Sequence, residues 1–164
     1  MHTHLSSAQS DFLYNLYLAL REAPLSMHGR YRTFETAAVD MRPWHVEAIS
    51  LEALRHLVSE RKAKGLRRGH RMARKERGEQ LFAEGAPVMS KDEMLHFFFE
   101  NDRVTLVTGA ENGKDGIAHW SAQIPVPEGR LKGGSYSPRV TRADLAWADD
   151  ELRRYEAGQL AAAA

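Results

Sequence analysis

The chain has 164 residues, of which 43% are hydrophobic and 27% charged, and this balance excludes a wholly disordered chain because its apolar side chains can offset the entropy of ordering. No apolar run approaches the roughly 18 residues that cross a bilayer, and the absence of cysteine excludes disulfides, iron–sulfur clusters, thiolate zinc sites and cysteine nucleophiles. The N-terminal residues lack the basic and then apolar order of a signal peptide, so we expect a cytoplasmic protein without a membrane partner.

The formal net charge of +1 hides an uneven distribution. Residues 61–77, here called the basic segment, contain nine basic side chains and one acidic side chain, Glu76, and therefore carry +8. The remainder of the chain carries −7. Arginines outnumber lysines by 17 to 6, and planar guanidinium groups suit bidentate contacts with phosphates. Such a chain can bind a polyanion through one patch.

The first predicted element is a helix over 12–20. Apolar side chains recur there at helical spacing, and the helix must end before Pro24. Residues 26–33 have the basic and aromatic character of a loop, and residues 33–40 are compatible with a short helix. We therefore expect two helices separated by an irregular connection.

Ser50 is a candidate N-cap for a helix with an apolar stripe over 51–58. This helix runs directly into the basic segment, where Gly65, Gly69 and the following Gly78 each cost a helix about 1 kcal/mol relative to alanine. The basic segment is therefore helical, broken, or ordered only on binding. If it is helical, six cations lie on one side of it. These are Lys64, Arg67, Arg68, Arg71, Arg74 and Lys75.

Two capping boxes mark further helices. Ser90 with Glu93 opens a short helix that continues through the following phenylalanines. Thr141, with Asp144 three residues later, opens a final helix that we expect to end at Gly158.

Between these two helices the pattern changes to strands. Residues 103–108 are short and rich in β-branched side chains, which predicts a strand. Asn-Gly and Asp-Gly pairs within 111–116 predict a tight hairpin loop. Further strands are expected over 117–126 and 131–140.

Together these elements predict an α+β fold in a single domain over 1–164. A helical part spans about 7–100 and includes the basic segment. A small antiparallel sheet and a closing helix then occupy about 103–157.

The basic segment favours a small, non-catalytic nucleic-acid-binding protein. The six cations named above are the expected phosphate contacts, on DNA or RNA. A protein of this kind would act as a regulator, or as an inhibitor or adaptor on a nucleoprotein complex. The sequence leaves open whether the chain forms a homodimer.

Two other functions fit the same residues. A metal-independent nuclease would use His70 or His119 as general acid or base, with a nearby arginine to hold the developing charge. Alternatively, the basic segment would dock an acidic protein partner. The eight histidines show no spacing typical of zinc ligands, so we expect neither a metal nor a cofactor.

Overall fold

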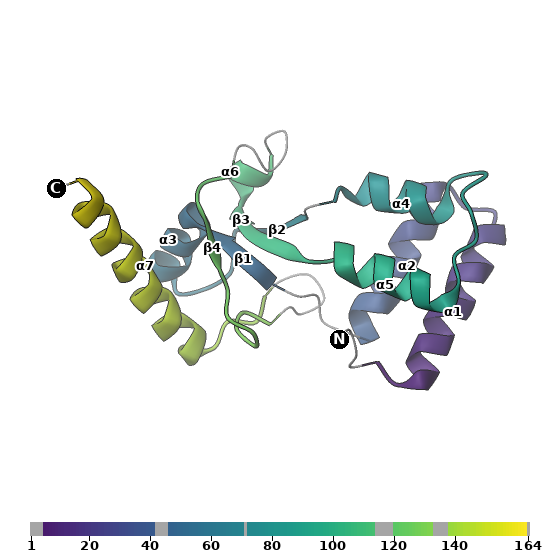
Figure 1. Cartoon of the computed structure of the whole chain (residues 1–164), viewed down its shortest axis with the longest axis horizontal. Helices are drawn as coiled ribbons and strands as arrows, with labels where there is room; N and C mark the ends of the chain where they lie inside the picture. The colour runs from purple at the N-terminus through teal and green to yellow at the C-terminus, as the bar shows by residue number, and fades with distance from the viewer. Residues whose placement is uncertain (1–4, 42–45, 71, 114–119, 133–137, 164) are drawn as a thin grey trace. The chain divides into compact units, whose positions relative to one another are not determined.

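A computed structural model describes residues 5–41, 46–70, 72–113, 120–132 and 138–163 (Figure 1). Its contacts divide the chain into two compact units. Unit 1 comprises Met1–Trp44 and His70–Arg103, and unit 2 comprises His45–Gly69 and Val104–Ala164. Each unit is therefore assembled from two separate stretches of sequence. The expectation of a single domain over the whole chain stays a prediction.

Unit 1 is helical. Its elements are α1 (Ser7–Glu22), α2 (Met27–Met41), α4 (Arg74–Phe82) and α5 (Lys91–Asn101). The helices enclose an aromatic core in which the ring centroids of Phe34 and Phe98 lie 5.0 Å apart in an edge-to-face arrangement. The core also contains Tyr17 and Phe82, whose ring centroids lie 5.7 Å apart. None of the helices in the described ranges is long and apolar enough to span a membrane.

The helices of unit 1 confirm two predictions and correct a third. The helix at 12–20 corresponds to α1, and the Ser90–Glu93 capping box opens α5 as expected. The loop predicted over 26–33 is wrong, because α2 begins at Met27. The hydroxyl of Ser26 accepts a hydrogen bond from the Gly29 N–H, as an N-cap serine does. Burial of the aromatic side chains of this stretch against the core outweighs its weak local helix signal.

Unit 2 contains a four-stranded sheet in the order β2-β3-β1-β4. The strands are β1 (Val46–Ser50), β2 (Leu66–His70), β3 (Val104–Thr108) and β4 (Gln123–Pro125). Strand β1 is parallel to β3 and antiparallel to β4. The helices are α3 (Leu51–Glu60), α6 (Gly109–Asn112) and α7 (Arg142–Ala163), and α7 packs against α3 (Figure 1). The predicted α+β class is confirmed.

The sheet itself differs from the expected one. It is mixed rather than antiparallel, because β1 and β2 come from the part of the chain that was predicted to be helical. The strand at 103–108 is confirmed as β3, but its neighbours in the sheet are β2 and β1, not the strand that follows it. The prediction of a hairpin that joins β3 to the next strand is therefore wrong. Gly109–Asn112 forms the short helix α6 instead. Residues 114–119 lie outside the described residues.

The last part of the chain confirms one prediction and corrects another, and a third stays a prediction. Thr141 and Asp144 exchange side-chain and backbone hydrogen bonds at the start of α7, as a capping box does. Gly158 does not end this helix, which continues to Ala163. In the strand expected over 131–140, residues 133–137 lie outside the described part, and the residues on either side of them belong to no described strand.

Candidate functional site

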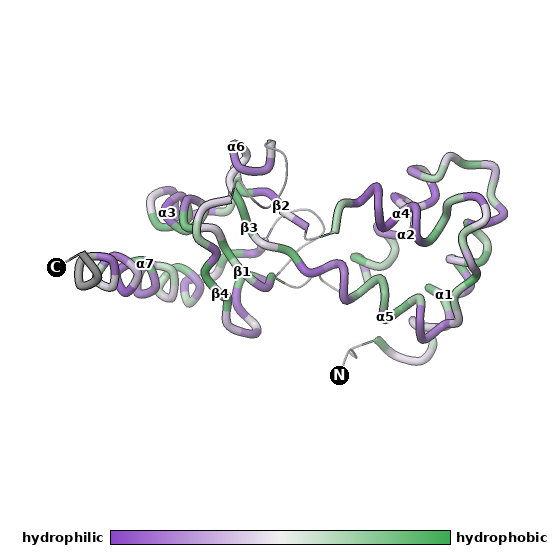
Figure 2. The backbone as a smooth tube through the Cα atoms, turned by 45° about the horizontal axis from the view of Figure 1, so that its top comes forward, coloured by the Kyte–Doolittle hydropathy of each residue, from purple (hydrophilic) through white to green (hydrophobic). Residues whose placement is uncertain are grey.

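The basic segment is not one helix. Its first half leads into β2 of unit 2, and its second half begins α4 of unit 1, while Arg71 lies outside the described residues. The single helical face of six cations is therefore not formed. Strand β2 is hydrophilic along most of its length, in contrast to β3 (Figure 2). Leu66 and Gly69 are the buried residues of β2, which pairs with β3 in the sheet.

The turn before β2 is held by α3. Helix α3 ends where Arg61 adopts a left-handed conformation with φ of 56°. Nε2 of His56 lies 2.7 Å from the carbonyl oxygen of Lys64, and its ring lies 3.2 Å from the position of a Cβ atom at Gly65. Gly65 has φ of +99°, which a residue with a side chain rarely adopts. These contacts position Lys64 at the entrance to β2.

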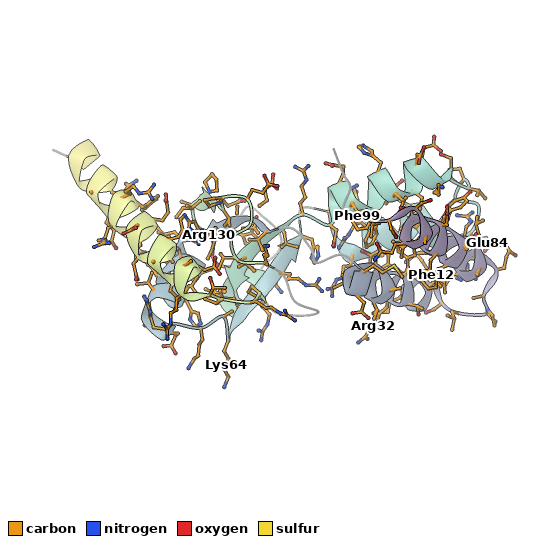
Figure 3. The ribbon with its side chains drawn as sticks, turned by 90° about the horizontal axis from the view of Figure 1, so that it is seen from below. Phe12, Arg32, Lys64, Glu84, Phe99 and Arg130 are labelled. Atoms are coloured by element: carbon orange, nitrogen blue, oxygen red, sulfur yellow. The ribbon has the colours of Figure 1, made fainter. Side chains whose placement is uncertain are left out.

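Three of the six predicted cations gather around β2. Lys64 and Arg67 are exposed, and Arg68 is half-buried. Figure 3 shows the Lys64 side chain extending away from unit 2. Nη1 of Arg67 donates to the Leu66 carbonyl oxygen at 3.1 Å. Within the described ranges, neither Lys64 nor Arg67 forms an ion pair with a carboxylate.

Two of the remaining predicted cations lie on α4 of unit 1. The Lys75 side chain is 81% exposed, with Nζ 3.8 Å from Oε1 of Glu79. Nε of Arg74 lies 3.0 Å from Oε1 of Glu35. Arg77, also part of the basic segment, is completely buried. Its charge is directed into unit 1 rather than toward a ligand at the surface.

Arg77 belongs to a buried cluster with Glu35, His70 and Asp102. Nη1 of Arg77 lies 2.9 Å from Oδ1 of Asp102, and Nη2 lies 3.8 Å from Oε1 of Glu35. Nε2 of His70 lies 3.6 Å from Oδ1 of Asp102 and forms no hydrogen bond within the described residues. One ligand atom from each of Glu35, His70 and Asp102 lies within 4.8 Å of the others.

The charges of this cluster balance without an added cation. The two carboxylates are matched by the guanidinium groups of Arg74 and Arg77. Burial, together with the positive charge of Arg77, lowers the pKa of His70 and outweighs its contact with Asp102. Burial opposes ionisation of Asp102, but His70 and Arg77 outweigh it and lower the pKa of that carboxyl. A divalent cation would add positive charge to a balanced interior, so these residues are better suited to holding unit 1 together.

The two histidines of the nuclease hypothesis have different positions. The His70 side chain is 7% exposed, and its Nε2 lies inside unit 1. His119 lies outside the described residues. A general acid or base must come within hydrogen-bond reach of the substrate, and the interior position of His70 is not suited to a polymeric phosphodiester.

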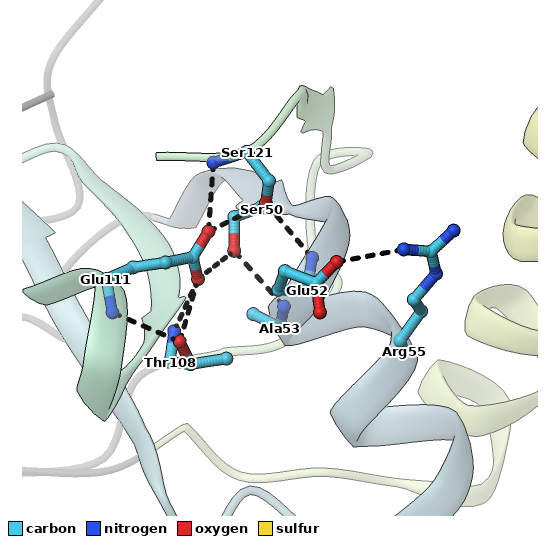
Figure 4. A network of polar contacts seen from close by, with 7 residues as sticks. All are labelled: Ser50, Glu52, Ala53, Arg55, Thr108, Glu111 and Ser121. Carbon is cyan, nitrogen blue, oxygen red and sulfur yellow. Dashed lines mark hydrogen bonds and ion pairs between the residues drawn. The ribbon is translucent and has the colours of Figure 1, made fainter. Parts of the chain in front are cut away.

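A second polar centre, built on the buried carboxylate of Glu111, lies in unit 2 (Figure 4). It accepts hydrogen bonds from the hydroxyl of Ser50 at 2.7 Å, and from both the backbone N–H and the hydroxyl of Ser121. It also accepts from the backbone N–H and the hydroxyl of Thr108, the N-cap of α6. Burial would raise its pKa, but these hydrogen bonds outweigh burial and lower the pKa to about 2. Glu111 thus joins the ends of β1 and β3 to the segment before β4.

Sequence reasoning identified neither carboxylate centre. Glu35 and Asp102 are far from His70 in sequence and meet it only through tertiary packing. Glu111 is preceded by Thr108 at capping-box spacing, which is a usable local signal, but the nearby Asn-Gly and Asp-Gly pairs favoured a loop.

Comparison with protein-family models, characterised proteins and solved structures yields no match.

Proposed function

We propose that this protein binds nucleic acid, with Lys64 and Arg67 at β2 as its principal phosphate contacts. The observation that supports this proposal is that both side chains are exposed and pair with no carboxylate in the described part of the chain. Cations without such partners attract phosphates more strongly than cations that are already neutralised. Arg68 on the same strand is the next candidate contact.

Three exposed arginines elsewhere in unit 2 contrast with this pair. On α7, Arg153 contacts Asp150, and Arg154 lies 3.0 Å from Glu151. On α3, Arg55 lies 2.8 Å from Glu52. These arginines have acidic partners on their own helices, so their contribution to the surrounding potential is small. Lys64 and Arg67 thus differ from these three arginines, and they share their lack of a carboxylate partner within the described residues with the exposed Arg139 and Arg142.

Two double variants test the proposal. Lys64→Ala with Arg67→Ala removes two unpaired cations, whereas Arg153→Ala with Arg154→Ala removes two charges from an ion-paired surface. Affinity for a short labelled oligonucleotide would be measured across a salt series for both variants and the parent chain. We expect the first variant to bind more weakly and to reduce the slope of log K against log salt by about 1.4 to 1.8, according to strand number. The second should resemble the parent.

Equal losses in the two variants would contradict a localised site and indicate attraction by net charge. Failure of the parent chain to bind any nucleic acid at low salt would contradict the proposal and favour an acidic protein as the partner of β2. The finer role, as a regulator, inhibitor or adaptor on a nucleoprotein complex, stays a prediction.

A further inference from the structure

An aromatic ring lies directly on the strand that carries the proposed phosphate contacts. A Cβ atom at Gly69 of β2 would lie 2.5 Å from both Cζ2 and Cη2 of Trp120. No real Cβ atom tolerates such a distance, so the absence of a side chain at Gly69 is what admits the indole ring. Trp120 as a residue is only partly buried.

Arg67 and Trp120 are placed on the same face of the sheet. Side chains alternate between the two faces along a strand, so Arg67 and the position of a Cβ atom at Gly69 point to the same side. Two residues along a strand correspond to a Cα separation of about 6.6 Å. An exposed arginine and a partly buried tryptophan therefore lie on the same face of β2, the strand at the edge of the sheet.

We infer that this surface selects single-stranded nucleic acid, with a base stacked on Trp120 and an adjacent phosphate bound by Arg67. This inference rests on the proposed function and specifies its substrate class. An aromatic side chain can stack only on a base whose face is uncovered, and in a duplex both faces are covered by neighbouring base pairs. A site built from cations alone would bind duplexes at least as tightly as single strands, because the phosphates of a duplex are more densely spaced.

The first experiment compares the parent chain with Trp120→Leu and Trp120→Phe. The ligands are a single-stranded oligothymidylate and a duplex of the same length, at one salt concentration. We expect the parent to prefer the single strand. The leucine variant should lose at least about fivefold in single-strand affinity, whereas the phenylalanine variant, which keeps an aromatic ring, should retain most of it.

A second measurement separates stacking from a folding defect. The oligothymidylate should quench tryptophan fluorescence in the parent, and this quenching should largely disappear in Trp120→Phe although binding persists. Phe12→Leu is the control, because Phe12 is an aromatic side chain, 50% exposed, on α1 of unit 1. It should leave single-strand affinity unchanged.

A duplex bound as tightly as the single strand, or an unchanged affinity in Trp120→Leu, would overturn the inference and leave the proposed function standing. Absence of binding to both ligands by the parent chain would overturn both.

Discussion

At the scale of single residues, Gly69 has the closest surroundings for an added Cβ atom among the described glycines. An added methyl group would meet two ring atoms of Trp120 at 2.5 Å and the Thr105 carbonyl oxygen at 3.2 Å. Either the indole or the strand must then move. We predict that Gly69→Ala lowers the free energy of unfolding by about 1 to 3 kcal/mol, the usual cost of overpacking. Urea unfolding followed by circular dichroism measures it.

Gly158 offers the matched control for this prediction. It lies in an exposed turn of α7, and a Cβ atom there would meet nothing within 4 Å. Gly158→Ala should therefore raise the free energy of unfolding by about 0.5 to 1 kcal/mol through helix propensity. If Gly69→Ala were neutral, or stabilising like Gly158→Ala, the described close packing of Trp120 on β2 would be contradicted.

His70 predicts a pH dependence of stability. Because its pKa is lowered in the folded chain, the unfolded chain binds the proton more readily once the pH falls below the ordinary value of 6.5. The contribution of neutral His70 is therefore complete above that pH and declines as the pH falls toward the folded pKa. We expect the parent to lose stability as the pH falls below about 6.5.

Replacing His70 by glutamine should reduce this loss, because the buried proton acceptor is removed. His28→Gln, which changes an exposed histidine of α2, should preserve the loss. Melting temperatures of the three proteins at several pH values provide the measurement. Identical pH profiles for His70→Gln and the parent would contradict the burial of a neutral histidine beside Arg77.

The residues that sequence reasoning identified correctly act on their immediate neighbours. Ser50, Ser90 and Thr141 were identified as caps, and each accepts a hydrogen bond from the N–H three residues later. Residues that act over long sequence distances were missed. Nothing local indicates that Glu35 and Asp102 share Arg77, because only the packing of unit 1 brings them together.

At the scale of elements, Glu111 connects strand ends and helix starts in unit 2. We predict that Glu111→Gln lowers the free energy of unfolding at neutral pH by about 2 kcal/mol, because an amide nitrogen would face donors that now bind a carboxylate oxygen. Glu52→Gln, at an exposed ion pair on α3, should cost far less. Chemical unfolding at pH 7 compares them, and equal costs would contradict the network in Figure 4.

The same carboxylate has a distinct acid response. Since the folded pKa of Glu111 is about 2, below the ordinary value of 4.5, its contribution is complete above about pH 4.5 and is lost as the pH falls toward 2. The parent should thus lose stability in this range more steeply than Glu111→Gln. Parallel acid unfolding curves of the parent and Glu111→Gln would show that these hydrogen bonds do not lower the pKa of Glu111 in the folded chain.

Strand β2 illustrates why elements were harder to predict than caps. Its sequence, Leu-Arg-Arg-Gly-His, contains no β-branched residue and little alternation of apolar side chains. The strand forms because Leu66 and Gly69 are buried in unit 2, with β3 alongside and Trp120 on the glycine. The glycines at 65 and 69 indicated correctly that a continuous helix was unfavourable. They did not indicate that a strand would form there instead.

At the scale of the whole molecule, the excess positive charge is divided between the two units. The cations at β2 belong to unit 2, whereas Arg74, Lys75 and the buried Arg77 belong to unit 1. The count of +8 in the basic segment was correct as a sequence property, but it overstated the charge available to a ligand. Composition predicted an interaction with polyanions, and only the fold distinguishes exposed cations from those used in the interior.

The central claim is that unpaired cations at β2 bind phosphates of nucleic acid without cleaving it. The most direct measurement is binding of the unmodified full chain to an end-labelled single-stranded oligonucleotide across a salt series, with the oligonucleotide analysed on a gel afterwards. We predict an affinity that falls steeply with salt and an intact oligonucleotide. Absence of binding at low salt, or a cleaved product, would contradict it.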